Sequence, residues 1–146
     1  MPLQNSYLVM KPMHARYFLD SNIFLYAFST KETHKQSIAK ELLLDNAIIS
    51  TQVVNETCSN LLKKLAFNET QVQAFIESCY SRYFIADVNQ KVFMRASHLR
   101  EHYLLSYYDS TIVAAALLSD CVILYSEDMQ HKQVIDSTLT IINPFL

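Results

Sequence analysis

A chain of 146 residues with 51% hydrophobic and 18% charged residues is long enough for one buried core and too apolar for disorder. Its formal net charge of -2 excludes a broad basic surface for nucleic acid, so any such contact must be local or assisted by a metal ion. The absence of glycine excludes the glycine-rich phosphate loops of Walker-type NTPases and of dinucleotide-binding folds.

The predicted strands and helices alternate along the chain, and Asn68 with Gln71 fits a capping box at the start of one helix. The first half is predicted to hold a strand over 16–19, helices over 22–28 and 34–44, a strand over 47–49, a helix over 51–66 and a helix from Asn68. The second half is predicted to hold a strand over 84–88, helices over 89–105 and 108–118, and strands over 121–125 and 139–142.

This alternation predicts an α/β fold, a three-layer α/β/α sandwich with a mostly parallel central sheet. The continuous apolar run over 121–125 is typical of a buried parallel strand. Residues 1–15 are predicted to be a flexible lead-in and residues 16–146 a single domain. In such sheets ligands bind beyond the carboxyl ends of the strands.

Signals for export or membrane insertion are missing from the sequence. The first residues lack the apolar core and cleavage site of a signal peptide, and no stretch approaches the roughly 18 apolar residues that span a bilayer. Cys58, Cys79 and Cys121 are odd in number and lie in apolar sequence, which favours reduced, buried thiols. We therefore expect a cytoplasmic protein without membrane contact.

Four acidic residues follow predicted strands or lie near the starts of predicted helices. Asp20 and Asp128 follow strands, Asp109 opens a helix, and Glu56 lies in the second turn of another. We expect all four carboxylates at one edge of the sheet, where an unpaired charge beside buried segments is costly without a cation. Oxygen ligands without histidine or cysteine favour Mg²⁺ or Mn²⁺ over zinc.

Each acid taken alone also has a structural explanation. Asp20 and Asp109 are both suitable helix caps, Glu56 suits a solvated helix surface, and Asp128 suits a polar turn. These explanations do not account for acids closing several strand-helix units at one sheet edge, and a metal site does. The neighbouring Glu127 is expected to be solvated.

The chain resembles the PIN-domain family of metal-dependent nucleases, in particular the VapC-type toxin ribonucleases. The resemblance runs from Tyr17 to Phe145 and implies that residues 16–146 form a PIN-like nuclease domain. Its four strings are Tyr17-Phe18-Leu19-Asp20-Ser21-Asn22, Ile49-Ser50-Thr51-Gln52-Val53-Val54-Asn55-Glu56, Ser106-Tyr107-Tyr108-Asp109-Ser110 and Leu124-Tyr125-Ser126-Glu127-Asp128-Met129-Gln130.

The resemblance also implies a function. It implies a homodimeric ribonuclease that cuts RNA with a metal-activated water and whose site is filled by the tail of an antitoxin. One or two Mg²⁺ or Mn²⁺ ions are implied, with Asp20 and Asp109 as the most direct ligands. The implied catalytic residues are the metal-binding acids Asp20, Glu56, Asp109 and Asp128 and the positioning groups Ser126 and Asn22.

Two positions depart from the family pattern, and one alternative function stays open. The family commonly has a glycine shortly after its last motif, where this chain has His131-Lys132, and its small residue after the third acid is here Ser110. Neither departure removes a carboxylate. A PIN-like module that binds RNA or protein without cutting is the alternative, against which the intact set of acids argues.

A second string predicts a different metal. His98-Leu99-Arg100-Glu101-His102 matches the H-x-x-E-H pattern of inverted zinc proteases, with both histidines on one helical face. The string is short, and a zinc site needs a third ligand and a substrate cleft. An amphipathic helix with surface histidines is therefore the favoured interpretation.

Aromatic and basic residues near the acids are weaker candidates. Tyr107, Tyr108 and Tyr125 could stack on bases, although a packing role is favoured for each. Surface solvation is the default for the basic residues near the motifs. The candidate phosphate contacts are Lys63, Lys64, Arg95, Arg100 and Lys132.

Overall fold

The computed structural model describes residues 16–44 and 46–146, so the predicted lead-in over residues 1–15 lies outside the described residues. The strands are β1 (Tyr17–Leu19), β2 (Ile48–Ser50), β3 (Phe84–Ala86), β4 (Ile123–Tyr125), β5 (Val134–Ile135) and β6 (Leu139–Ile142). The helices are α2 (Ser21–Phe28), α3 (Thr33–Leu44), α4 (Thr51–Lys64), α5 (Glu69–Arg82), α6 (Gln90–His102) and α7 (Tyr107–Leu118).

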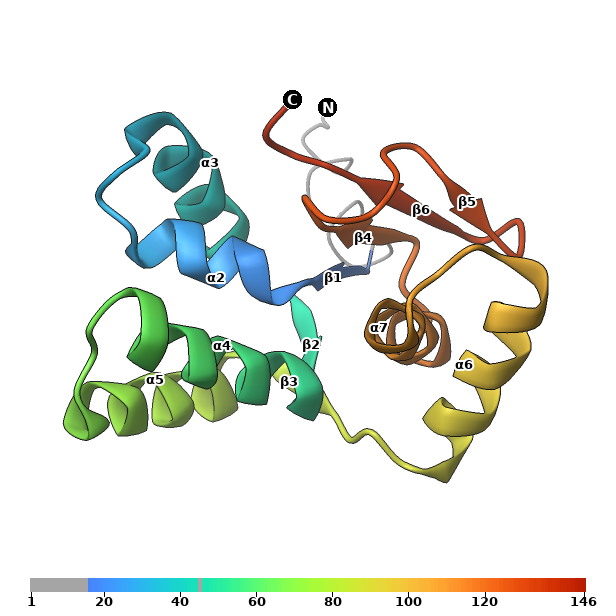
Figure 1. The fold of residues 1–146 in the computed structure, drawn as a ribbon, viewed down its shortest axis with the longest axis horizontal. Helices are drawn as coiled ribbons and strands as arrows, with labels where there is room; N and C mark the ends of the chain where they lie inside the picture. Colours follow the sequence, from blue (N-terminus) through green and yellow to red (C-terminus); the bar gives the residue numbers. More distant parts are fainter. Residues whose placement is uncertain (1–15, 45) are drawn as a thin grey trace, which may run out of the picture.

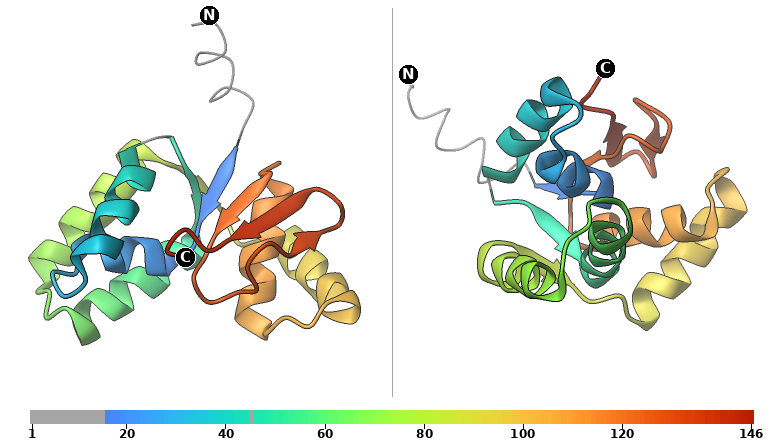
Figure 2. Two further views of the ribbon diagram at one scale, coloured as in Figure 1. Left: turned by 90° about the horizontal axis from the view of Figure 1, so that it is seen from above. Right: turned by 60° about the vertical axis from the view of Figure 1, so that its left-hand side comes forward.

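The strands form one mostly parallel sheet in the order β3-β2-β1-β4-β6-β5. Every pair is parallel except β5 with β6. Figures 1 and 2 show α2, α3, α4 and α5 on one side of the sheet and α6 and α7 on the other. The predicted three-layer α/β/α sandwich is confirmed.

The order of the strands reverses between β1 and β4. The chain adds β2 and β3 outward on one side of β1 and then returns to place β4 on the other side. In open α/β sheets the crevice beyond the carboxyl ends of the strands at such a reversal is the usual ligand site. The residues that follow β1 and β4, Asp20 and Ser126, lie at this point.

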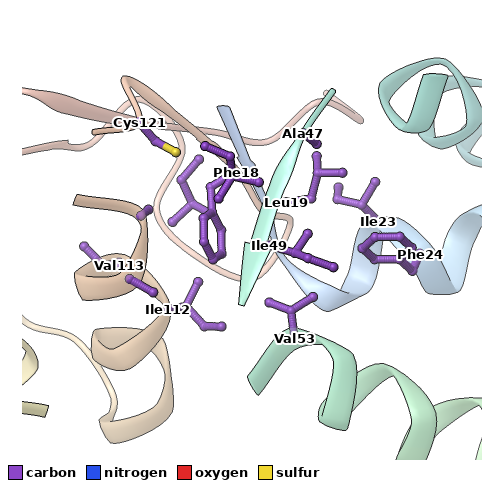
Figure 3. Packing of buried hydrophobic residues seen from close by; sticks show 14 of the residues in the cluster. Phe18, Leu19, Ile23, Phe24, Ala47, Ile49, Val53, Ile112, Val113 and Cys121 are labelled. Atoms are coloured by element: carbon purple, nitrogen blue, oxygen red, sulfur yellow. The ribbon is translucent and has the colours of Figure 1, made fainter. Parts of the chain in front are cut away.

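The core forms on both faces of β1 because side chains of a strand alternate between the two faces. Phe18 and Leu19 are fully buried, and Figure 3 shows Phe18 on the side of Ile112 and Leu19 on the side of Ile23. The middle of α7 is apolar or small on all sides because this helix lies between the sheet and α6. Its buried run is Ser110, Thr111, Ile112, Val113, Ala114, Ala115 and Ala116.

Most predicted boundaries are correct within a few residues, and the capping box of Asn68 and Gln71 is confirmed. One strand escaped prediction: β5 has two residues and pairs antiparallel with β6 at the edge of the sheet. The alternative explanation of Asp109 as a helix cap is wrong, because Ser106 caps α7 and Asp109 is the third residue of this helix.

Left-handed backbone is taken by residues other than glycine, since the chain has none. Lys132, with a φ of 69°, is such a residue in the stretch where the family commonly has glycine. For a residue with a Cβ this conformation costs roughly 1–2 kcal/mol. The others with positive φ are Ala66, Asp120, Asp136 and Ser137.

Two of the three cysteines are buried thiols, as the sequence predicted. Cys58, Cys79 and Cys121 are all free, and burial raises the pKa of the Cys79 and Cys121 thiols to about 12. Cys58 is only partly buried, contrary to the expectation for it. Within residues 16–44 and 46–146, every helix is too short or too polar to cross a membrane.

Candidate active site

A pocket of about 570 Å³ lies at the end of β1, between α4 and α7. Part of its wall comes from Lys63 on α4 and Tyr108 on α7. The pocket brings together all four predicted acids, Asp20, Glu56, Asp109 and Asp128. These acids come from four separate segments of the chain, so only the folded sheet and its flanking helices place them together.

Asp20 is the most enclosed of the four acids, with 5% of its surface exposed. It caps α2, since its Oδ1 accepts a hydrogen bond of 2.7 Å from the backbone N–H of Ser21. Its Oδ2 accepts a hydrogen bond of 2.8 Å from the buried Oγ of Ser126. The helix-cap explanation is therefore correct for Asp20, but it accounts for only one of the two carboxylate oxygens.

Burial raises the pKa of Asp20 to about 7. The hydrogen bonds from Ser126 and Ser21 act in the opposite direction, and the negative charges of Glu56 and Asp128 raise the pKa further. A carboxylate in this position is costly to ionise unless a cation shares the pocket.

Asn22 and Ser126 together hold the segment after β4. Asn22 Nδ2 donates to Asp128 Oδ2 at 3.1 Å, and Asn22 Oδ1 accepts from the backbone N–H of Glu127 at 3.3 Å. Ser126 Oγ also accepts from the backbone N–H of Asp128 at 3.2 Å. Both predicted positioning residues thus contact predicted metal ligands. Asn22 lies after β1, and Ser126 lies after β4.

Glu127 was expected to be solvated, but it is bound to two neighbouring side chains. Its two carboxylate oxygens accept hydrogen bonds of 2.6 Å from Tyr26 Oη and from Lys35 Nζ. Burial opposes ionisation of Glu127, but these hydrogen bonds outweigh it and keep its pKa below the ordinary value. The pair anchors the segment that carries Asp128 to α2 and α3.

Glu56 lies in the second turn of α4, as predicted, and is partly buried. Burial raises its pKa, the nearby Asp109 and Asp128 add to this, and a hydrogen bond from Gln52 opposes it. Gln52 Nε2 donates to Glu56 Oε2 at 3.2 Å, one turn away on the same helix.

Gln52 was not among the predicted site residues. Its Nε2 also reaches the backbone carbonyl of Tyr108 at 3.3 Å, and its Oε1 accepts a hydrogen bond from Thr111 Oγ1. It therefore ties α4 to α7 beside the acids. The signal in the sequence was the spacing of four residues between Gln52 and Glu56, which places both on one helical face.

Asp109 is partly buried near the start of α7. Its backbone N–H donates to Ser106 Oγ at 3.1 Å, which completes the cap of the helix. Burial raises the pKa of its carboxyl, Asp128 raises it further, and a hydrogen bond with Ser106 opposes the rise. The start of a helix is a favourable place for a carboxylate because of the helix dipole.

The charge and chemistry of these residues fit a hard divalent cation. Over residues 16–44 and 46–146, none of the ion pairs involves any of the four acids. The donors are carboxylate oxygens, which Mg²⁺ and Mn²⁺ prefer. In the described part of the chain, however, no three acidic, histidine or cysteine side chains lie close enough to surround one ion. The acids share a pocket without the tight convergence expected of a coordination sphere.

The aromatic candidates divide into two kinds. Tyr125 packs edge-on against Tyr17, with ring centroids 5.6 Å apart, so the packing interpretation is correct for it. Tyr107 and Tyr108 are 54% and 66% exposed, so neither belongs to the core, although their rings pack edge-on against each other. They lie at the start of α7, next to Asp109.

Two of the basic candidates are already engaged within the protein. Arg95 pairs with Asp136 at 2.9 Å, and Arg100 donates to Ser110 Oγ at 2.7 Å. Lys63 is exposed and lines the pocket of the acids. Exposed positions are also held by Lys64 and Lys132.

The zinc-protease string lies on α6, which contributes no residue to the pocket of the acids. His98, Glu101 and His102 are all exposed. Among the residues that the structure describes, no third ligand completes a site with these histidines. The string therefore belongs to an ordinary surface helix, the favoured interpretation.

The sequence matches the PIN domain family over residues 17–136. The chain belongs to the PIN domain family. PIN domains generally use a divalent metal ion, which agrees with the oxygen donors around the pocket. A comparison with curated protein sequences finds no match.

Solved structures share the PIN fold of this chain at low sequence identity. A toxin-antitoxin complex from Klebsiella pneumoniae is 22% identical with a TM-score of 0.67, covering 88% of this PIN domain chain and 97% of its own. VapC20 from Mycobacterium tuberculosis, a sarcin-ricin loop cleaving toxin, is 18% identical with a TM-score of 0.63, covering 77% and 89%. VapBC2 from Rickettsia felis, bound to a promoter DNA fragment, is 21% identical with a TM-score of 0.61, covering 86% and 96%.

Proposed function

We propose that this PIN domain is a Mg²⁺- or Mn²⁺-dependent endoribonuclease that hydrolyses phosphodiester bonds of RNA. The observation that carries the proposal is the single pocket that four carboxylates from separate segments line, one of them the buried Asp20. Asp20 is buried and Glu56 and Asp109 are partly buried, and in the described part of the chain none of them has an ion pair, which is costly unless a cation binds there.

The proposed metal ligands are Asp20, Asp109, Glu56 and Asp128, with Asp20 and Asp109 as the most direct. Three of them are held by neighbours: Ser126 bonds to Asp20, Asn22 to Asp128 and Gln52 to Glu56. These bonds engage one oxygen of each carboxylate, and the other oxygen of Asp20 accepts from the backbone N–H of Ser21. When bound, a divalent ion lowers the pKa of a coordinated water and stabilises charge on the leaving oxygen.

The same carboxylates also control access of the substrate. Without a cation, their negative charge repels a phosphate backbone, whereas Lys63 on the pocket wall attracts it. Binding of RNA and its hydrolysis should therefore both depend on the metal. The net charge of -2 leaves no strong attraction elsewhere on the chain as a whole.

We further propose that the protein is the toxin of a toxin-antitoxin pair and forms a homodimer. Support comes from the fold shared with the Klebsiella pneumoniae toxin-antitoxin complex and with VapBC2, over nearly the whole of both chains. In this proposal the antitoxin inhibits by occupying the acidic pocket. RNA is the proposed substrate, and the shared fold of VapC20, a sarcin-ricin loop cleaving toxin, supports a nuclease role.

Expression of the chain alone in bacteria tests this function. The wild type should arrest growth, Asp20→Asn should abolish the arrest at equal protein level, and the exposed Asp87→Asn should preserve it. Arrest that persists in soluble Asp20→Asn would contradict a nuclease mechanism. An RNA-binding chain that neither arrests growth nor cuts RNA with metal present would instead be the non-catalytic module.

A further inference from the structure

A second hollow of about 370 Å³ adjoins the acidic pocket. Its walls come from α4, α6 and α7, and it shares Asn55 and Tyr108 with the acidic pocket. We call it the aromatic hollow because Phe93, Tyr107 and Tyr108 line it. Its volume lies in the range of small-molecule sites.

The rings of the aromatic hollow are not part of the core. Phe93 is 49% exposed, Tyr107 54% and Tyr108 66%. Scattered apolar residues on a surface need no explanation, but three rings around one hollow that opens beside the acids do. Their π faces can accept any flat, apolar group that enters between them.

Tyr107 is held in place by its neighbours. The guanidinium of Arg100 lies 4.6 Å from the centre of the Tyr107 ring, and it is itself fixed by its hydrogen bond to Ser110 Oγ. The Tyr107 and Tyr108 rings meet edge-on with centroids 5.3 Å apart. The cation-π contact and the ring pair both limit the movement of Tyr107.

Tyr108 is held through its backbone, and its ring stays largely exposed beside the ring of Tyr107. Its carbonyl accepts a hydrogen bond of 2.7 Å from Thr111 Oγ1 and one of 3.3 Å from Gln52 Nε2. Gln52 also bonds to the proposed metal ligand Glu56, so the ring and that acid share one support. The distance between aromatic hollow and acids is thereby fixed by α4 and α7.

We infer that the aromatic hollow binds an unpaired nucleobase of the RNA strand whose phosphate lies at the acids. This inference rests on the proposed function and deepens it, because it assigns the residues that hold a base of the substrate. A base within a duplex is stacked and paired and cannot enter the aromatic hollow, whereas base stacking on aromatic rings tolerates any sequence. Stacking also supplies affinity that this acidic chain cannot obtain from charge alone.

Binding experiments in the Asp109→Asn background, which prevents cleavage, test the inference in Mg²⁺. The probes are fluorescein-labelled oligo(A) of eight nucleotides, an abasic strand of equal charge, and a duplex of equal length. The single strand should bind about tenfold more tightly than the abasic strand, and Tyr108→Ala should remove this difference. Tyr108→Phe should retain it, because the ring remains.

Tyr80→Ala is the matched control, because Tyr80 is an exposed tyrosine on α5 that does not line the aromatic hollow. It should bind all three probes as the parent does. Equal binding of single-stranded and abasic RNA by the parent, or an unchanged preference in Tyr108→Ala, would overturn the inference. So would equal binding of the duplex.

The aromatic hollow and the proposed function fail in distinguishable ways. In the otherwise wild-type chain, Tyr108→Ala should raise the KM for single-stranded RNA about tenfold, and the control Tyr80→Ala should leave this KM unchanged. If Tyr108→Ala cleaves RNA with an unchanged KM, the base-binding inference fails while the proposed nuclease function stands. If the chain never cuts RNA but its preference for bases depends on Tyr108, the base-binding inference stands and the proposed nuclease function fails.

The remaining outcome is that the aromatic hollow binds a protein surface and not a base. If Tyr108→Ala converts a dimer to a monomer in light scattering, and RNA binding falls only with dimer content, the aromatic hollow is an interface between copies. That result would also overturn the inference.

Discussion

Ser126 Oγ donates a hydrogen bond of 2.8 Å to Asp20 Oδ2, joining the residues that follow β4 and β1. The backbone N–H of Asp20 also donates to the carbonyl of Tyr125 at 3.0 Å, which extends the pairing of the two strands by one residue. The point at which the strand order reverses therefore carries a buried carboxylate whose two oxygens both accept hydrogen bonds. This arrangement underlies the stability and metal dependence that we predict.

Ser126→Ala should destabilise the protein by about 1–3 kcal/mol, because the buried Asp20 loses its side-chain donor. The same change should raise the pKa of Asp20 further above its ordinary value. Urea unfolding measures the loss of stability. Ser97→Ala, at an exposed position of α6, is the control and should change stability by less than about 0.5 kcal/mol.

The metal-free protein should lose stability as the pH rises from about 4 to about 7. Because the pKa of Asp20 is about 7 in the folded chain and near 4 in the unfolded chain, the folded state binds more protons over this interval. At most about 4 kcal/mol of unfolding free energy is involved, from about 1.4 kcal/mol for each pKa unit.

Urea unfolding in EDTA at pH 5 and pH 8 measures this change. Asp20→Asn should be less sensitive to pH than the wild type and more stable than it at pH 8. Glu56 and Asp109 shift in the same direction, so a smaller slope should remain in the variant. A wild type that is more stable at pH 8 than at pH 5 would contradict the burial of an uncompensated carboxylate.

Asp109→Asn should fold normally and be inactive. Removing one of several like charges relieves repulsion, so the variant should be as stable as the wild type or more stable when a chelator is present. Thermal unfolding in EDTA and an RNA cleavage assay make the comparison. A marked loss of stability would show that the side chain serves chiefly to complete the start of α7.

Gln52→Ala should weaken metal binding and activity while changing stability little. The residue orients Glu56 and links α4 to α7, and it occupies a partly buried position. We expect the concentration of Mn²⁺ that gives half-maximal activity to rise about tenfold, as for the loss of other groups that orient metal ligands. Gln73→Ala, on the exposed face of α5, should leave it unchanged.

The fold and the acids were predictable because they depend on local patterns. Strands and helices differ in their hydrophobic period, and Asp20 and Asp128 were recognisable because each follows a strand. The edge strand β5 was not predictable, since two residues carry no period and its pairing is antiparallel to the rest of the sheet. Prediction from sequence was thus strongest where several residues carry one signal.

Contacts between distant segments of the chain could not be predicted from the sequence. Glu127 appeared solvated because its partners, Tyr26 and Lys35, lie about a hundred residues earlier in the chain. The exposure of Tyr107 and Tyr108 was not predictable because composition does not reveal which face of α7 the sheet covers. The distances among the four acids depend on side-chain placement and charge repulsion, which no spacing rule contains.

The central claim is that RNA cleavage depends on a metal ion bound by the four acids and not by the histidines of α6. The most direct test is cleavage of single-stranded RNA by the purified chain, free of any antitoxin, with His98→Ala plus His102→Ala compared with the wild type. Activity of both proteins should vanish in EDTA and return with Mg²⁺ or Mn²⁺. A folded but inactive double variant, or activity that only Zn²⁺ restores, would contradict the claim.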